Sequence, residues 1–386
     1  MKEIRDIIRA FDLAQQLGKQ TALATVVQVE GSSYRRPGAR MLITEDGELT
    51  GAISGGCLEG DALRKARLSM IQKMSLIVSY DTMDDEDATI GLGLGCNGVI
   101  HVLIEPIDQN DPCNPIVLLK KVAAQREKAV LITLFSLQEK KDQQEGTCLL
   151  ITANNILEGR ATSLKDILIN EGRHVLAGKQ SIFRNYIAAG RKQSAFIELI
   201  KPAVSLVIAG AGNDVVPLVD MATILGWETT VIDGRPALAK KERFALGCQV
   251  MLAKPEKIID KLHIDEYTVF VLMTHNYNYD LAMLQSLLHR NVSYVGMLGP
   301  KKKIERMLDD LSEKGMQLTR GQLGSIHSPV GLDLGAENPE EIALSIISEI
   351  KAVLSGRKGF SLHANTGSIH ERDEWVNISI TGNEHG

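Results

Sequence analysis

Two glycines lead directly into a cysteine in the segment AISGGCLEG (52–60). Gly55 and Gly56 precede Cys57, and Glu59 follows at the predicted start of a helix. A thiol at a helix start faces the positive end of the helix dipole, which favours the thiolate form. A thiolate is a soft ligand for metals and metal–sulfur groups. Because a lone cysteine is usually a small core residue, the assignment needs neighbouring groups that support it.

Two other segments of the same half offer such groups. Cys96 stands in the glycine-rich stretch GLGLGCNGV (91–99), two residues before Gly98. Both Cys57 and Cys96 follow glycine turns whose backbone N–H groups can converge on an anion. The segment SYRRPGAR (33–40) supplies guanidinium groups suited to bidentate anion binding, from Arg35, Arg36 and Arg40. Together the three segments predict one site for an anionic ligand that carries sulfur or a metal.

Composition limits the classes of protein that could hold this site. The chain has 386 residues, 44% hydrophobic, with a net charge of −5 and scattered basic residues, which disfavours a nucleic-acid binder. No apolar run reaches the roughly 18 residues of a membrane span. The start MKEIRDIIRAF is an amphipathic helix rather than a signal peptide, so we expect a cytoplasmic protein. Five cysteines without a CxxC pair favour reduced thiols over disulfides or zinc.

The N-terminal half contains a faint internal duplication. A shift of 108 residues places ALATVVQ (22–28) on VLITLFS (130–136) and GARMLITEDGELTGAIS (38–54) on GTCLLITANNILEGRAT (146–162). Further on, VLIEP (102–106) resembles ELIKP (198–202) at a shift of 96. Each copy then reads as helix, strand, loop, hairpin, helix and one closing strand.

The three segments with chemistry occur in the first copy alone. The second copy has QQEGTC in place of RRPGAR and TSLK in place of SGGC, and it lacks 12 residues around the segment of Cys96. Loops on a rigid scaffold are where function usually lies. We therefore expect a duplicated α+β domain over residues 1–203, with copies at 1–107 and 115–203, whose first copy carries the site.

From residue 204 the pattern changes to alternating apolar strands and helices, typical of a doubly wound parallel sheet of the Rossmann type over 204–356. A polar tail, 357–386, follows, with EWVNISI as a possible edge strand. The strand VSLVIAGAGN (204–213) opens into a glycine turn, and Asn338 with Pro339 predicts the start of a last helix whose first acidic residues are capping charges.

Candidate binding residues follow the predicted strand ends of this domain: Gly210, Gly212, Asp233, Arg235, His275, Asp280 and Lys301. Asp233 stands where an acid can accept a ribose hydroxyl, and Arg235 where a cation can meet a phosphate. The third glycine of the G-x-G-x-x-G pattern is replaced by Val215. A nicotinamide-dependent oxidoreductase with His275 as acid or base is the second hypothesis, which Val215 disfavours.

Taken in order, these motifs resemble the XdhC/CoxI family from about Ala22 to Ile350: ATVVQVEGSSYRRPGARMLI, GAISGGCLEG, GLGLGCNGVIHVLIEP, VIAGAGNDVVPL, TVIDGRP, LMTHNYNYD, YVGMLGPKKK and PVGLDLGAENPEEIALSIISEI. Asn97, Asn276 and Pro300 depart from the residues usual in that family.

The resemblance implies an accessory protein that binds molybdenum cofactor (molybdopterin) transiently, protects it during sulfuration and delivers it to the apoenzyme of xanthine dehydrogenase or a related molybdenum hydroxylase. Cys57 would contact the molybdenum, and the arginines the pterin phosphate. A cysteine desulfurase, a second copy of the chain in a homodimer, and a nucleotide or NAD(P) at the Rossmann-like domain are the further partners it implies. The alternatives are an NAD(P)-dependent oxidoreductase and a structural adaptor.

Overall fold

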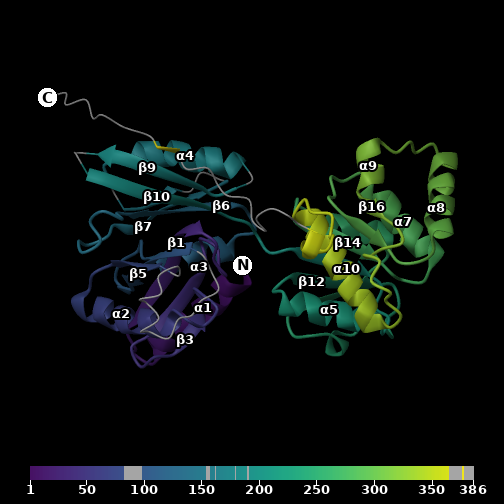
Figure 1. Ribbon diagram of the computed structural model, residues 1–386. Helices are drawn as coiled ribbons and strands as arrows, with labels where there is room; N and C mark the ends of the chain where they lie inside the picture. Colours follow the sequence, from purple (N-terminus) through teal and green to yellow (C-terminus); the bar gives the residue numbers. More distant parts are fainter. Residues whose placement is uncertain are drawn as a thin grey trace. The chain divides into compact units, whose positions relative to one another are not determined.

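The computed structural model describes residues 1–81, 98–153, 157–160, 162–178, 180–188, 191–364 and 376–377. The chain divides into two compact units (Figure 1). The first contains Met1–Pro202 and His370–Gly386, and the second contains Ala203–Ile369. Within the described ranges, no helix has both the length and the apolar character needed to cross a membrane.

The first half of unit 1 is a five-stranded antiparallel sheet with the strand order β3-β2-β1-β5-β4, called sheet A here. One helix precedes the first strand and another connects the hairpin to the last two strands. The elements are α1 (Lys2–Gln16), β1 (Thr21–Gly31), β2 (Arg40–Thr44), β3 (Leu49–Gly51), α2 (Glu59–Gln72), β4 (Leu76–Asp81) and β5 (Gly98–Pro106).

The second half has the same strand order, β8-β7-β6-β10-β9, with β17 (Val376–Asn377) added parallel to β9 at the edge; this is sheet B. Thr21 pairs with Thr44 in sheet A and Ala129 with Thr152 in sheet B, a shift of 108 in both strands. Its elements are α3 (Pro115–Ala124), β6 (Ala129–Phe135), β7 (Gly146–Thr152), β8 (Leu157–Gly159), α4 (Lys165–Ala177), β9 (Ile182–Ala188) and β10 (Arg191–Ile200).

Two details of the duplication differ from the sequence prediction. Each half closes with two antiparallel strands after its second helix, whereas one was expected. The last strands are also aligned differently: Leu23 pairs with Glu105 and Leu131 with Glu198, so they lie 93 residues apart rather than 96. Aligning Pro106 with Pro202 by sequence was wrong because β10 ends at Ile200, before its proline.

Sheets A and B pack face to face with a helix on each outer side. The outer face of sheet A packs on α2 through Ala62, Ala66 and Met70, and that of sheet B packs on α4 through Leu168 and Val175. The inner faces meet through a cluster that contains Val27, Leu103, Phe135, Phe183 and Phe196. A second shared cluster joins α1 and α3 to both sheets. The duplicated halves therefore share two hydrophobic clusters. Figure 1 shows sheets A and B as neighbouring layers of unit 1.

Unit 2 is a parallel six-stranded sheet with the order β13-β12-β11-β14-β15-β16, and the expected Rossmann-type sheet is confirmed. Its strands are β11 (Ser205–Ala209), β12 (Glu228–Asp233), β13 (Gln249–Leu252), β14 (Thr268–Leu272), β15 (Val295–Met297) and β16 (Ile326–His327). Its helices are α5 (Val215–Ile224), α6 (Pro255–Ile258), α7 (Tyr277–Leu287), α8 (Lys301–Glu313), α9 (Arg320–Gly324) and α10 (Pro339–Leu354).

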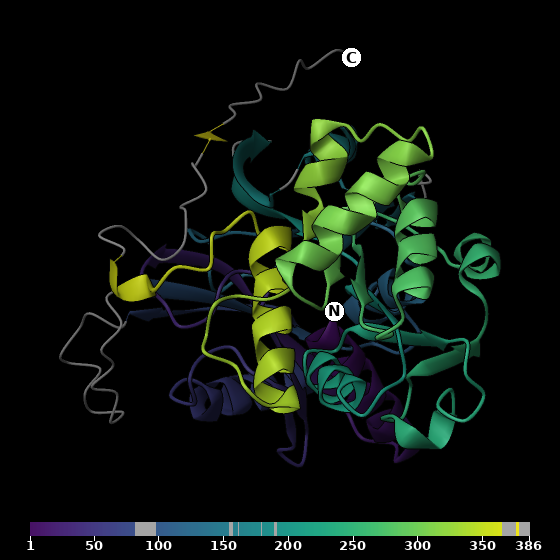
Figure 2. The same ribbon diagram turned by 90° about the vertical axis from the view of Figure 1, so that its right-hand side faces the viewer.

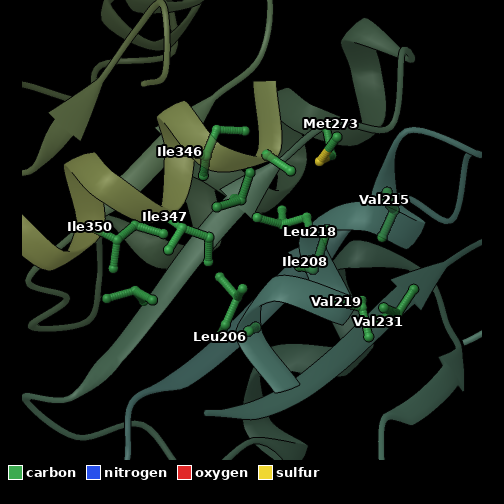
Figure 3. Close-up of a cluster of buried hydrophobic side chains, with 14 of the residues drawn as sticks. Leu206, Ile208, Val215, Leu218, Val219, Val231, Met273, Ile346, Ile347 and Ile350 are labelled. Carbon is green, nitrogen blue, oxygen red and sulfur yellow. The ribbon is translucent and has the colours of Figure 1, made fainter. Parts of the chain in front are cut away.

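Helices cover both faces of this sheet, which is why its central strands are apolar without alternation. One face packs on α5 and α10, where Ile346, Ile347 and Ile350 point toward Leu206 and Leu218 (Figure 3). The other face packs on α7 and α8. Figure 2 shows α10 in yellow and α8 in light green as separate helices over this unit. Asn338 caps α10 and Pro339 is its first residue, as expected, and Glu341 completes a capping box with Asn338.

Candidate functional site

Two of the three segments that the sequence singled out in the first copy, residues 32–39 and 52–58, follow strands that run toward the same edge of sheet A. β1 and β4 both run antiparallel to β5, so Gly31, Asp81 and Gly98 lie together at this edge. Residues 32–39 start here, whereas residues 52–58 follow β3, whose last residue Gly51 pairs with Met41 and lies level with Ala24, seven residues before Gly31 in β1. The ring of Tyr34 lies against Gly55, which brings these two segments into contact. Cys96 and Asn97 fall outside the described residues.

The SGGC segment is a turn closed by the hydroxyl of Ser54. The backbone N–H groups of Gly56, Cys57 and Leu58 all donate to Ser54 Oγ at 3.2 Å. Gly56 has φ +113°, in the region that favours glycine. The sequence predicted that these amides would converge on an anionic ligand, but they converge on Ser54.

Glu59 completes this turn rather than facing a ligand. Its carboxylate accepts the Ser54 backbone N–H at 2.8 Å and the Ser54 hydroxyl at 2.5 Å. Burial works against the charged form, but these hydrogen bonds hold the pKa of Glu59 below its ordinary value. Glu59 is the first residue of α2, where the helix dipole also stabilises a carboxylate. It therefore fixes the conformation that presents Cys57.

Cys57 is half-buried and its thiol is free. It lies in the turn directly before α2, beside the contact between Tyr34 and Gly55. Among the described cysteines, Cys148 and Cys248 are buried, and Cys113 is half-buried like Cys57 but lies in the connection to α3. Within the described ranges, Cys57 is the thiol that combines partial exposure with the glycine turn.

The three arginines of the first copy have different environments. Arg36 is exposed, and Arg35 is half-buried in an ion pair with Glu3 of α1. Arg40 is 2% exposed and forms a bidentate pair with Glu198 of β10. Arg40 was predicted to bind an anionic ligand, but its guanidinium instead joins the two halves of unit 1. Gly98, another predicted site residue, is required because a Cβ there would collide with the backbone of Glu30 and Ser32.

The glycine turn of unit 2 is shaped by its neighbours. Gly210 has φ +120°, and a Cβ at this position would collide with the backbone carbonyl of Met273. Gly212 lies against the carboxylate of Asp214. Val215, which replaces the third glycine, is the first residue of α5 and is fully buried in the core beneath it. Because Gly210 has no side chain, the chain that leaves β11 can pass close to the end of β14.

Asp233 is enclosed by groups of the protein. Arg235 donates to it from its backbone N–H at 2.8 Å and from its side chain at 2.9 and 2.7 Å, and the Ala211 N–H donates at 2.8 Å. Burial opposes the charged form, but these bonds lower the pKa of Asp233. The sequence predicted a free carboxylate for a ribose and a free guanidinium for a phosphate. In the structure the two groups bind each other.

The end of β14 carries a second pair. His275 has φ +57°, rare and strained for a residue with a side chain, and its Nε2 lies 2.9 Å from Oδ2 of Asp214. The histidine side chain is 64% exposed, so this pair faces solvent at the carboxyl edge of the sheet. The exposed Lys301 begins α8 at the same edge.

Asp280 is fully buried and does not face the crevice as predicted. It accepts hydrogen bonds from Thr274 Oγ1 at 2.6 Å and from Lys303 Nζ at 2.7 Å. Sequence reasoning missed Lys303, although it belongs to the same basic run as Lys301, because helical phase decides which lysine points inward. It also missed Arg243, which donates to the carbonyl of Ala211 and supports the glycine turn.

Two further findings limit the chemistry of the described residues. They contain no group of three or more His, Cys, Asp or Glu residues that could hold a metal ion. A cavity of about 370 Å³ lies beside Leu262, His263 and Arg290. These residues precede β14 and β15, so the cavity lies at the amino edge of the sheet, opposite Gly210 and His275.

Comparison with known proteins gives the family. Residues 14–81 match the description "XdhC and CoxI family", and residues 206–350 match "XdhC Rossmann domain". A Bacillus subtilis protein named as a probable subunit of xanthine dehydrogenase is 30% identical over 86% of this chain and 92% of its own. The chain belongs to the XdhC and CoxI family.

Two other similar proteins cover most of the chain. The "Molybdenum cofactor insertion chaperone PaoD" of Escherichia coli is 24% identical over 90% of this chain and 88% of its own. A crystal structure described as a xanthine dehydrogenase from Bacillus halodurans has a TM-score of 0.73 and 29% identity, and covers 92% of this chain and 97% of that one. The XdhC-type fold therefore extends over both units.

Proposed function

We propose that this protein is an accessory protein of a molybdoenzyme, which binds molybdenum cofactor as cargo at the edge of sheet A formed by residues 32–39 and 52–58. Family membership and the relative named as a cofactor insertion chaperone support this role. The observation that carries it is the half-buried thiol of Cys57, presented by a self-closed turn beside the segment of exposed Arg36.

The donor set suits such a cargo. A thiol is a soft donor that matches a molybdenum–sulfur centre. A guanidinium in reach of solvent matches a phosphate, which it can bind through two parallel hydrogen bonds. The turn is already folded by Ser54 and Glu59, so a ligand would meet Cys57 without further ordering of this segment. Sulfuration of the cargo, a cysteine desulfurase partner, delivery to xanthine dehydrogenase apoenzyme and action as a homodimer are parts of the same proposal.

The proposal also includes the binding of a nucleotide to unit 2. The carboxyl edge of the parallel sheet, with Gly210, His275 and Lys301, is where such folds bind nucleotides. A ribose could reach Asp233 after Arg235 turns away, since the Arg235 side chain is 51% exposed. The alternative of an NAD(P)-dependent oxidoreductase needs both this rearrangement and a dinucleotide turn without its third glycine.

The cargo hypothesis is tested by cofactor retention in matched cysteine variants. Wild type, Cys57→Ala and the control Cys113→Ala are purified from cells that make the cofactor, then denatured, and the released pterin is measured by fluorescence and mass spectrometry. We expect pterin with wild type and Cys113→Ala, and a loss of at least about tenfold, the scale of one charged contact, with Cys57→Ala. Equal retention in both variants would remove Cys57 from the site.

The arginine contact is tested by titration with salt. Arg36→Ala should weaken cofactor binding, and the difference from wild type should shrink as salt rises because the lost interaction is screened. Arg36→Lys keeps the charge without the bidentate geometry and should fall between the two. Rapid NAD(P)H turnover with a small substrate, in place of pterin binding, would instead favour the oxidoreductase hypothesis.

A further inference from the structure

Three side chains form a hydrogen-bonded row across neighbouring strands of sheet A. Ser79 of β4 and His101 of β5 are directly paired, and Ser79 Oγ lies 2.7 Å from His101 Nδ1. His101 Nε2 lies 3.3 Å from Oε1 of Glu30, near the end of β1. A fourth group, Lys140 Nζ from the second half, lies 2.7 Å from Ser79 Oγ.

The chemistry of the four groups fixes the direction of these hydrogen bonds. An ammonium group can only donate, so Ser79 Oγ accepts from Lys140. The carboxylate of Glu30 can only accept, so Nε2 of the neutral ring carries the proton and donates to it. His101 Nδ1 is then an acceptor, and Ser79 donates its hydroxyl proton to it. This is the arrangement of a nucleophile, its base and the carboxylate that orients the base.

The surroundings keep the base uncharged. His101 is 5% exposed, and burial lowers its pKa although Glu30 acts in the opposite direction and Lys140 acts with burial. Gln28 donates to Glu30 Oε1 at 3.0 Å and so holds the carboxylate that meets the ring. Ser79 itself is half-buried, while Glu30 and Lys140 are exposed, so the row opens to solvent at its ends.

The second half supplies an internal comparison. Asn185 and Ser194 form the equivalent cross-strand pair of β9 and β10. There Ser194 Oγ donates to Asn185 Oδ1 at 2.8 Å, and no base is present in that pair. The same scaffold therefore keeps a neutral polar pair in one copy and places a serine, a histidine and a glutamate in the other.

We propose that Ser79 is a nucleophile activated by His101, with Glu30 as positioning residue, and that it acts on carboxylic esters. Ser79 Oγ forms a bond to the carbonyl carbon while its proton passes to His101 Nδ1. The carbon–oxygen bond to the alcohol breaks, and the alcohol leaves with that proton. Water then attacks the acyl group, gives a proton to His101, and releases the acid as Ser79 regains its proton. Lys140 stabilises the developing alkoxide.

The experiment uses the full chain and diisopropyl fluorophosphate, which phosphorylates activated serines with loss of fluoride. Intact-protein and peptide mass spectrometry locate the adduct and give its rate. We expect one adduct, on Ser79, absent in Ser79→Ala and unchanged in Ser194→Ala, the serine of the equivalent pair. His101→Gln should slow labelling by about a hundredfold, the scale of general-base catalysis. Hydrolysis of p-nitrophenyl butyrate should follow the same order.

The role of Glu30 is tested by the pH dependence of the labelling rate, which a purely structural residue would not change. As the pH is lowered, the labelling rate of wild type should stay constant until the pH is below the ordinary pKa range of histidine, because the pKa of His101 is lowered. Glu30→Gln should change this pH profile, and Glu30→Asp should restore part of the rate. An unlabelled Ser79 in folded wild type, or equal rates in wild type and His101→Gln, overturns the proposal.

Discussion

The two halves of unit 1 share a strand order and a helix position, yet equivalent glutamates in them have different hydrogen-bond partners. Glu105 and Glu198 occupy the same place in their sheets, and each reaches into the opposite half. Glu198 meets the guanidinium of Arg40, whereas Glu105 accepts from the backbone N–H and hydroxyl of Thr147, at 2.7 and 2.8 Å. The position equivalent to Arg40 is Cys148, a buried thiol.

The two glutamates explain why both of the equivalent positions 38 and 146 hold a glycine. Both have a positive φ, and a Cβ at either position would collide with the glutamate from the other half. Each carboxylate thus joins the halves beside an equivalent glycine, but the charge of only one of them, Glu198, is balanced by a buried arginine. The comparison shows that duplication kept the geometry of the interface, while substitution at one position changed its electrostatics.

The largest expected effect comes from Glu198→Gln, because it leaves the guanidinium of Arg40 buried and unpaired. Removing one partner of a buried pair costs about 3–5 kcal/mol of unfolding free energy. Trp227 packs on the core of unit 2, so its fluorescence would not follow a loss in unit 1. The loss should therefore be measured by hydrogen exchange at the amides of β2 and β10. Arg40→Met combined with Glu198→Leu should recover much of it. Unchanged exchange in Glu198→Gln would contradict the role of the pair.

A smaller effect is expected from Ser54→Ala, which removes the acceptor of three backbone N–H groups and a donor to Glu59. Leaving backbone donors of this turn without their acceptor costs about 1–3 kcal/mol. Because Cys57 depends on this turn, cofactor retention should fall with the loss of local order. The equivalent change in the second copy, Thr162→Ala, should leave retention unaltered. Hydrogen exchange at the amides at the start of α2 is the measurement, and it should be faster in Ser54→Ala than in wild type.

The smallest effect is expected from Glu105→Gln, and it has the opposite sign. Burial raises the pKa of Glu105, although the hydrogen bonds from Thr147 and, after them, Arg160 and Arg40 act in the other direction. A raised folded-state pKa means that the charged carboxylate costs stability once the pH rises through it, while the protonated form does not. Glu105→Gln should therefore be more stable than wild type at pH 8 and similar to it at pH 4, by thermal unfolding. Destabilisation at pH 8 would contradict this.

Much of the fold could be predicted from the sequence because it rests on local patterns. The shift of 108 residues identified β1 with β6 and β2 with β7, since apolar alternation and turn glycines survive duplication. The apolar runs at β11, β12 and β14 predicted the parallel sheet, because strands buried on both faces cannot alternate. The start of α10 at Asn338 and Pro339 followed from local residue types and their order.

What the tertiary structure decided was the partner of each charged group. Arg40, Asp233 and Asp280 have the residue types of ligand contacts, but Glu198, Arg235 and Lys303 occupy them. Glu198 comes from the other half of the duplication and Lys303 from another helix, and sequence spacing does not encode such distances. Arg235 lies only two residues after Asp233, but its side-chain conformation decides whether the two groups pair. The row of Ser79, His101 and Glu30 was missed for the same reason, since cross-strand register alone brings it together. The sequence by itself determined which scaffold forms, and only packing determined which side chains it leaves for chemistry.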